Sequence, residues 1–572
     1  MMQVQHLFVL NGKTQITTSI LAQIGSIARQ GLDWYQAQDP RPDYYRNLPS
    51  YYANSFPSIA KELQAEIERN PDHLQIDWPR LYAANMSHSE SIVDANGVLG
   101  NTISGNRSLY VLSSDVERTS KMALATNGQF KLNEHFFLSA GLHYSIQQVN
   151  YFKRLDDLLG GDYFLNVNQF AVQHQMMQYD LLVPNRAVQQ SQRYNYNYKV
   201  NAHQAFAWAQ VELDTRKWNM FTALSLNYTA YRRIGLYQNG LFPNNSLGKS
   251  PLMAFMQAAN KMGIQYKLNG RNYLYAHACF GTQEPGFNQV FISARTRNQT
   301  LDTIQQALYA SCEIGYFLKA PKLIMRASFY ATEINRSTSM QRFYNDDPAF
   351  QTYVNFVQQH LNTRSIGLEW GMSYAISSLW TLQAAAAIGQ SYYTNNPQVL
   401  VFTDNDTNTH PSVQSVFIKN YYQGVGPQSA YTLGFTYNSK RYWYTKLNVV
   451  FSDRNYVAIN PARRTIAAAE LIDRASPEFA AIFGQEQLSP IINVQLSGGK
   501  SIRLHKIFPQ MKYGTSMYVS MGINNLLPQS NSKLMGYEQL RYDFVQNNPN
   551  KFPNKYVYAL GTTFFIQASL KL

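Results

Sequence analysis

Long runs of strictly alternating residues constrain the fold of this chain more than any other feature. Successive side chains of a β-strand point to opposite faces of the sheet. One face of the segment after Arg441 carries Trp443, Thr445, Leu447, Val449 and Phe451, and the other carries Tyr442, Tyr444, Lys446 and Asn448. Segment 218–229 alternates in the same way. Runs of about ten residues exceed the usual five or six of soluble strands and suit a strand with lipid on one side.

Short polar turns separate these runs. Asn11-Gly12 and Asn269-Gly270 are two-residue hairpin signals. Further tight reversals are predicted at 132–135, 214–218, 319–322, 377–380, 438–441 and, more loosely, 503–514. The pattern predicts a row of short turns along one rim of an antiparallel sheet.

The other connections are long, roughly 20 to 70 residues, and rich in Tyr, Asn, Pro and Asp. They are predicted at 30–105, 151–198, 236–255, 395–427, 457–488 and 526–555. Two amphipathic helices are predicted inside them, at 59–69 and 467–483. Short turns on one side and long loops on the other are typical of an outer-membrane β-barrel.

Composition supports the same fold class. Aromatic residues make up 14% of the chain and charged residues 15%, against roughly 25% charged residues in soluble domains. No run of about 18 apolar residues occurs, so the sequence predicts no membrane-spanning helix. The remaining way to satisfy the backbone in lipid is a closed barrel. A mean hydropathy of -0.34 agrees, because only alternate residues would face lipid.

The sequence therefore predicts an all-β protein, a transmembrane antiparallel β-barrel with long extracellular loops and short helices. Counting the alternating segments gives about 17 strands, although single-chain bacterial barrels have even strand numbers. Trp218, Trp380 and Trp443 lie next to short turns, where an interfacial aromatic girdle is expected.

Charge and cysteine usage exclude other classes. The net charge is +14, but the Lys and Arg residues form no continuous stripe in the sequence, so we expect no nucleic-acid partner. Contact with anionic lipid headgroups, or plain solvation, accounts for the excess. Cys279 and Cys312 are predicted on neighbouring strands but on opposite faces, which forbids a disulfide.

No motif indicates an enzyme or a cofactor site. Segment 246–250 ends like a phosphate-binding loop, but Pro243 stands where that loop requires Gly. The 11 histidines are dispersed and show no metal-ligand spacing. Loop carboxylates that could hold Ca²⁺, although solvated acids are more common, are Asp156, Asp157, Asp404 and Asp406.

The C-terminal segment, 556–572, also alternates. Phe564, Ile566, Ala568, Leu570 and Leu572 share one face. The segment is similar to the terminal strand by which the barrel-assembly machinery recognises outer-membrane proteins. The alternative is an ordinary edge strand, which would be an aggregation hazard in a soluble protein.

Four segments together resemble the TonB-dependent outer-membrane receptors, in particular the Bacteroidetes type. They are 39–51 (DPRPDYYRNLPSY), 157–163 (DLLGGDY), 269–274 (NGRNYL) and the terminal strand. The resemblance covers nearly the whole chain, 1–572, as a receptor barrel domain. It implies a barrel of about 22 strands, an N-terminal plug inside it and a short segment that contacts TonB.

The resemblance also predicts what this sequence does not contain. Counted back from Leu572, about five strands and the plug are expected to be missing. Residues 1–12 have no basic region, apolar segment or cleavage site of a signal peptide. We therefore expect a C-terminal fragment of a receptor of the Gram-negative outer membrane. Its expected partners are outer-membrane lipid and lipopolysaccharide, the barrel-assembly machinery, and TonB only through the missing plug.

The expected function is active uptake of a scarce nutrient such as a siderophore complex, a corrinoid or an oligosaccharide. Candidate ligand contacts in the first long loop are Arg41, Tyr44, Tyr45 and Arg46, which combine cationic donors with stacking surface. Packing against neighbouring loops is the alternative role of these residues. A passive porin or adhesin-like barrel and an outer-membrane hydrolase are the alternative functions, although no Ser/His or paired-acid site supports the hydrolase.

Overall fold

A computed structural model describes residues 1–53, 55–171, 173–345, 352–404, 411–468, 470, 472–527 and 531–571. One antiparallel sheet of 21 strands dominates it. Four of these strands are short, with two to six residues, and extend longer neighbours. The remaining 17 have nine to 24 residues, which confirms the predicted count and the transmembrane β-barrel fold class.

The long strands are β1 (Met2–Asn11), β2 (Thr14–Trp34), β5 (Tyr110–Lys131), β6 (Phe136–Asp157), β9 (Arg193–Asp214), β10 (Trp218–Gly235), β12 (Met253–Lys267), β13 (Asn272–Gln283), β14 (Ala307–Lys319), β15 (Leu323–Asn345), β16 (Thr352–Ala375), β17 (Trp380–Tyr393), β20 (Pro427–Asn438), β21 (Trp443–Tyr456), β23 (Ile491–Arg503), β24 (Ser516–Asn524) and β27 (Thr563–Lys571). The short strands of the same sheet are β11 (Gly248–Lys249), β18 (Gln398–Thr403), β19 (Ser412–Ser415) and β22 (Gln487–Leu488). Three two-stranded sheets lie in the loops: β3 (Ser89–Ile92) with β4 (Ile103–Asn106), β7 (Phe164–Leu165) with β8 (Ala187–Val188), and β25 (Lys533–Tyr537) with β26 (Lys555–Tyr558).

Helices occur only in connections within the described part of the chain. The α-helices are α1 (Pro49–Tyr52), α2 (Pro57–Arg69), α3 (Trp78–Met86), α4 (Phe287–Val290) and α5 (Pro477–Phe483). The 3-10 helices are η1 (Tyr45–Asn47), η2 (Pro71–Leu74), η3 (Ala95–Gly97), η4 (Pro461–Arg464) and η5 (Leu504–Lys506). Among the described residues, no helix has the length and apolarity needed to cross a membrane.

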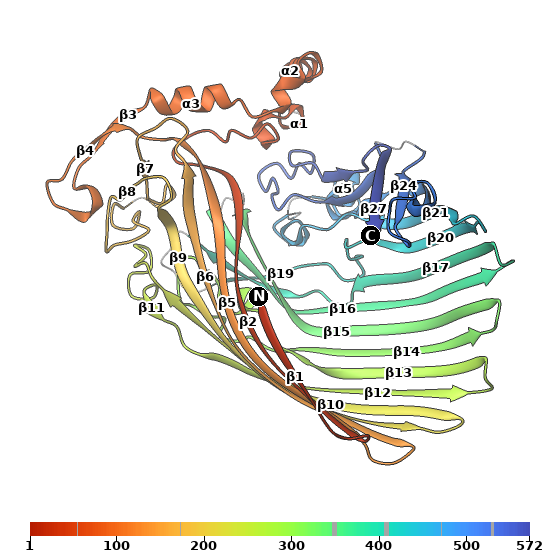
Figure 1. The fold of residues 1–572 in the computed structure, drawn as a ribbon. Helices are drawn as coiled ribbons and strands as arrows, with labels where there is room; N and C mark the ends of the chain where they lie inside the picture. Colours follow the sequence, from red (N-terminus) through yellow and green to blue (C-terminus); the bar gives the residue numbers. More distant parts are fainter. Residues whose placement is uncertain are drawn as a thin grey trace.

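Each long strand pairs with its neighbours in the chain, so the sheet is an antiparallel meander that curls from β1 round to β27 (Figure 1). Over the described residues, β1 pairs with β2 alone and β27 with β24 alone. The sheet therefore has two unpaired edges.

The predicted short turns all connect paired strands. Asn11 lies opposite Thr14 in the first hairpin, and Lys267 lies opposite Tyr273 across the Asn269-Gly270 turn. The Asn269 side-chain oxygen accepts hydrogen bonds from the backbone N–H groups of Arg271 and Asn272, at 2.9 and 3.0 Å. An Asn side chain that takes over backbone hydrogen bonds in this way explains why these turns could be read from the sequence.

The outward face carries the predicted apolar residues. Leu224 and Leu226 of β10 are 64% and 56% exposed, as expected for side chains that would meet lipid. The Trp218 ring lies 4.4 Å from that of Tyr266, and Tyr437 lies 4.7 Å from Trp380 and 5.0 Å from Trp443 (ring centroids). These aromatic pairs stand beside the short turns, where the girdle was predicted.

Several predicted boundaries are wrong. β2 runs on to Trp34 and β5 begins at Tyr110, so the first long loop is 35–109 and lies four or five residues later than the predicted 30–105. A long connection, 284–306, was not predicted at all. The helix predicted at 467–483 is only α5, because Pro477 begins it and the Ser476 hydroxyl accepts from the Phe479 N–H at 3.1 Å.

The C-terminal segment contains two strands, not the one that was predicted. Segment 555–558 is not part of the last strand but forms the separate strand β26, and β27 begins at Thr563. Leu572 and Asp406 lie outside the described residues.

Cys279 pairs with Ser311 rather than with Cys312, so the two cysteines are on opposite faces and both are free, as predicted.

Aromatic rings lie flat over glycines on the inward face. A Cβ on Gly315 would meet the Tyr275 ring at 2.2 Å. Tyr275 cannot move away easily, because its hydroxyl donates to Glu313 at 2.7 Å and accepts from Arg326 at 2.6 Å. Gly371, on the same face, has 3.9 Å to the nearest atom that a Cβ would meet.

This contrast yields a paired stability prediction. Gly315→Ala should lower the free energy of unfolding by about 1–3 kcal/mol because of overpacking against Tyr275, whereas Gly371→Ala should leave it unchanged or slightly raised. Urea titration of the protein in lipid vesicles, followed by tryptophan fluorescence, measures both. Equal stability of the two variants would contradict the tight ring-on-glycine packing.

Candidate ligand-binding vestibule

A cavity of about 410 Å³ lies where the loop-side ends of the strands meet the long loops. We call it the vestibule. Its wall comes from the ends of β2, β9, β15 and β16 and from connections 158–192 and 284–306. The lining residues that bear on function are Asp33, Trp34, Tyr179, Tyr194, Arg295, Arg342, Tyr353 and Asp404. Aromatic surface and charged groups thus share one small cavity, the usual make-up of a ligand site.

The carboxylate of Asp33 is held at the end of β2. It accepts hydrogen bonds from the Lys153 ammonium at 2.6 Å and from the Tyr194 hydroxyl at 2.7 Å. Neither the Asp33 nor the Lys153 side chain is more than about a quarter exposed. This side of the vestibule is therefore pre-organised by contacts within the protein.

Two arginines also line the cavity. Arg342 forms an ion pair with the buried carboxylate of Asp404, and its guanidinium lies 5.3 Å from the Tyr353 ring centroid. Arg295 lies 3.4 Å from a carboxylate oxygen of Asp115. Both arginine side chains remain at least 40% exposed, so each can still donate hydrogen bonds to a ligand.

Tyr179 is one lining residue with an unused hydrogen-bonding group. Within the described residues, its hydroxyl has no hydrogen-bond partner. Burial raises the pKa of Tyr179, so the hydroxyl stays protonated at neutral pH. It can therefore donate a hydrogen bond to a bound molecule.

Two buried arginines lie behind the lining, in connection 284–306 and at the end of β10. Arg233 donates to the backbone oxygens of Ala294 and Ser246 and to Asn298, at 2.6 to 2.8 Å. Arg297 is 0% exposed and stacks 4.4 Å from the Phe242 ring, and its three side-chain nitrogens have no partner in the described part of the chain. Neither arginine has a carboxylate partner there, so they add uncompensated positive charge near the vestibule.

The four ligand contacts predicted from the sequence lie beside the vestibule and do not line it. The Arg41 guanidinium is held by both oxygens of Asp39 and lies 5.4 Å from the ring centroid of Trp34, which does line it. Tyr44 and Tyr45 contact each other edge-to-face at 4.7 Å, and the Arg46 Nε donates to the Tyr45 hydroxyl at 2.9 Å.

Tyr45 joins the first long loop to the last one. Its ring is only 7% exposed and lies 4.9 Å from the Phe552 ring and 4.3 Å from the Arg541 guanidinium. Beside it, Asp43 forms an ion pair with Lys555. We call these five residues the loop clasp. Tyr45 therefore has the packing role considered as the alternative, and a ligand role for Arg41, Tyr44, Tyr45 and Arg46 stays a prediction.

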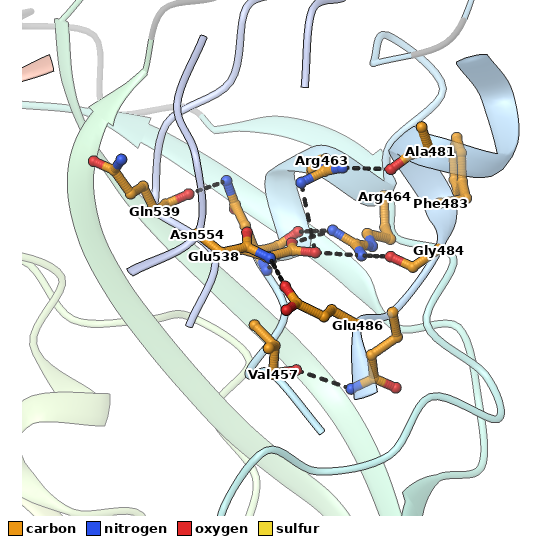
Figure 2. A network of polar contacts seen from close by, with 12 residues as sticks. Val457, Arg463, Arg464, Ala481, Phe483, Gly484, Glu486, Glu538, Gln539 and Asn554 are labelled. Carbon is orange, nitrogen blue, oxygen red and sulfur yellow. Dashed lines mark hydrogen bonds and ion pairs between the residues drawn. The ribbon is translucent and has the colours of Figure 1, made fainter. Parts of the chain in front are cut away.

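A buried charge network fixes the last two long loops to each other (Figure 2). Arg464 is fully buried and forms an ion pair with Glu538, which also pairs with Arg463 at 3.6 Å. A second carboxylate, that of Glu486, accepts from Asn554 at 2.8 Å. These contacts tie residues 463–464 and 486 to residues 538 and 554.

Removing one partner of the buried pair should loosen this surface. Glu538→Gln leaves the Arg464 guanidinium uncompensated and should cost about 3 kcal/mol of local stability. Hydrogen exchange of the backbone amides of 460–464 measures the loss. Glu66→Gln, which breaks a solvent-exposed pair with Arg69, is the matched control and should leave exchange unchanged. Unchanged protection in Glu538→Gln would refute the stabilising role.

Two of the loop carboxylates considered for Ca²⁺ form ion pairs within the protein. Asp156 accepts from Arg154 at 2.7 Å, and Asp404 pairs with Arg342. Across the described ranges, no group of three or more His, Cys, Asp or Glu side chains is placed to hold a metal ion.

Comparison with solved structures finds proteins that share this fold. The chain is similar to the copper transporter OprC (10% identity, TM-score 0.55, covering 99% of this chain and 64% of that one). It is also similar to the siderophore receptor PiuA from Acinetobacter baumannii (14%, 0.54, 99% and 63%) and to the ferric citrate transporter FecA in its unliganded form (10%, 0.50, 99% and 69%). The chain thus spans less than two thirds of the first two proteins. Their similarity to this chain establishes a shared fold.

No protein-family model matches this sequence, and no curated protein matches it. We therefore infer the function from the fold and from the chemistry of the vestibule.

Proposed function

We propose that this chain is the barrel domain, 1–572, of a TonB-dependent outer-membrane receptor that takes up a scarce nutrient. The observation that carries the proposal is the meander of 17 long strands, whose fold is shared with a copper transporter, a siderophore receptor and a ferric citrate transporter. A receptor needs a ligand site in addition to a barrel. The vestibule, a cavity of aromatic and charged groups under long loops, has the make-up of such a site. The motifs that resemble the Bacteroidetes type favour that branch of the family.

The ligand that fits the vestibule best is anionic. Arg295 and Arg342 present guanidinium groups to the cavity, and Arg233 and Arg297 add positive charge behind it without a carboxylate partner among the described residues. In a partly desolvated cavity such charge favours a negatively charged guest. Among the siderophore, corrinoid and oligosaccharide classes, a negatively charged ferric siderophore complex therefore fits best.

In the proposed receptor, the two unpaired sheet edges are joined by about five further strands, giving about 22 in total. TonB would pull on a plug inside the completed barrel. Ligand bound in the vestibule would then cross the barrel when the plug moves. The barrel-assembly machinery would recognise β27 and insert the chain into the outer membrane. The supporting observation for additional strands is that β1 and β27 each have one strand partner among the described residues.

The proposal predicts what the neighbouring DNA encodes. Translating the DNA upstream of the codon for Met1 in all three frames should give alternating strand segments, a plug-like domain and a signal peptide. Unrelated sequence in all three frames would contradict the proposed additional strands and plug.

Conductance separates a receptor fragment from a passive porin. The purified chain in a planar bilayer should give no steady single-channel current, because an open sheet does not enclose a pore. A stable open-pore current of uniform size would favour the porin and would overturn the receptor fragment.

Ligand binding tests the vestibule directly. We expect an anionic ferric chelate such as ferric citrate to quench tryptophan fluorescence of the purified chain more strongly than a neutral corrinoid or a neutral oligosaccharide. Tyr179→Phe should weaken binding about fivefold to tenfold through loss of one hydrogen bond, without changing thermal stability.

The matched control is Arg364→Gln. Arg364 is paired with Glu333 on β15 and β16 and does not line the vestibule. Equal affinity of Tyr179→Phe and Arg364→Gln, or tighter binding of the neutral oligosaccharide, would refute the proposed anion site.

A further inference from the structure

The short turns of the sheet carry an unusual share of the positive charge. They follow one another along a single edge of the curled sheet (Figure 1). We call these turns and the adjoining strand ends the basic rim. It consists of segments 11–14, 131–136, 214–218, 267–272, 319–323, 375–380, 438–443 and 500–516 and of Lys571 at the end of β27.

The basic rim accounts for nearly all of the net charge of +14. It contains 15 Lys and Arg residues and two acidic residues. The rest of the chain contains 34 of the 49 Lys and Arg residues and 33 of the 35 Asp and Glu residues, so it is nearly neutral. The sequence did not reveal this concentration, because the cations are dispersed along the chain and only the pairing of the strands brings them to one edge.

Most cations of the basic rim have no acidic partner. The two acidic residues, Glu134 and Asp214, are paired with Lys131 at 2.9 Å and with Lys267 at 2.6 Å. None of the other 13 cations forms an ion pair within the described residues, and every cation in the turns themselves is exposed. The basic rim therefore presents uncompensated positive charge to solvent.

The cations at the strand ends face mainly the inside of the sheet. Their facing follows from the strand registers, counted from Tyr275 on the inward face. The inward cations are Lys131, Lys267, Lys319, Arg503 and Lys571. Lys500 faces outward, as does Trp443 opposite it. Headgroups of the surrounding lipid would need cations on the outward face, so the strand ends favour a different partner.

The cations in the turns lie beyond the aromatic girdle and recur at short intervals. Trp218 directly follows the cations of 216–217, and one residue separates Trp443 from those of 440–441. Girdle residues mark the headgroup level, so these cations stand at its aqueous border. Successive turns are two strands, or about 10 Å, apart. An array of this kind, without a focal point, suits an extended polyanion that contacts several turns at once.

We propose that the basic rim binds the carboxylate-bearing peptides of the cell-wall peptidoglycan. The short turns of an outer-membrane barrel face the periplasm, so the basic rim faces the layer beneath the membrane. Carboxylates recur along that polymer as the cations recur along the rim. Several exposed ion pairs, each weak alone, together give firm attachment. The inference depends on the membrane-spanning fold and is independent of the proposed uptake function.

The test is cosedimentation of the purified full chain, in a neutral detergent, with isolated peptidoglycan sacculi. The chain left in the supernatant gives an apparent Kd. We expect binding at 0.1 M salt and release of most of the chain at 1 M salt, because the Debye length falls from about 10 Å to about 3 Å. Sacculi whose carboxylates have been converted to neutral amides should retain little of the chain.

A variant with four fewer cations assigns the binding to the basic rim. Arg216→Gln/Lys217→Gln/Lys440→Gln/Arg441→Gln should raise the apparent Kd about tenfold, because each exposed ion pair contributes a small part of the binding. These four side chains are exposed and form no ion pair among the described residues, so we expect the variant to fold. Lys440→Gln/Arg441→Gln should raise the apparent Kd about threefold, which keeps the test usable if the fourfold variant folds poorly.

The matched control removes four exposed cations from the long loops. Lys61→Gln/Arg80→Gln/Lys419→Gln/Arg474→Gln makes the same change in net charge and should leave the apparent Kd unchanged. A competition separates the wall from lipid. Mixed micelles of phosphatidylglycerol, at a phosphate concentration equal to that of the wall carboxylates, should leave most of the chain on the sacculi.

Three results would overturn the inference. The first is the same apparent Kd for the rim variant and the loop variant. The second is full retention of the chain on amidated sacculi, which would mean that the carboxylates are not recognised. The third is complete release by phosphatidylglycerol, which would identify the basic rim as a lipid site.

Discussion

The rest of this structure depends on the need of every backbone N–H and C=O for a hydrogen-bond partner in a medium without water. An antiparallel meander of neighbouring strands meets this need with the shortest connections, and its registers decide which side chains meet lipid. Leu224 lies opposite Ala209 on one side and Asn260 on the other. A slip by one residue would turn Leu224 and every outward neighbour on its strand to the inner face. The alternation in the sequence and the strand register in the structure therefore reflect the same constraint, which is that apolar side chains must face lipid.

Features that depend on local chemistry could be predicted from the sequence. The turn at Asn269-Gly270 and the opposite facing of Cys279 and Cys312 follow from turn residues and from the two-residue period. The vestibule could not be predicted, because Asp33, Tyr179 and Arg342 are far apart in the chain and only loop packing brings them together. The helix expected at 467–483 failed for a local reason, since Pro477 fixes a later start. A closer reading of Ser476-Pro477 could have found that boundary.

Three buried arginines in the loops and at the end of β10 differ in how their charge is compensated. Arg464 has Glu538 as its counter-ion and holds two loops together. Arg233 is equally buried but has only neutral acceptors, and Arg297 has none among the described residues. A buried cation without a counter-ion is costly. Groups of this kind persist where a bound molecule or ordered water completes them, which is why the charge near the vestibule argues for an anionic ligand.

The loop clasp constrains how the two sheet edges can be completed. Along β1 and β27 every described residue is exposed, and both strands carry apolar side chains, which makes two free edges hazardous in water and costly in lipid. Yet the first and last long loops already meet, through Tyr45 against Phe552 and Arg541 and through Asp43 with Lys555. Strands added between the edges must therefore fit beneath an existing bridge of loops.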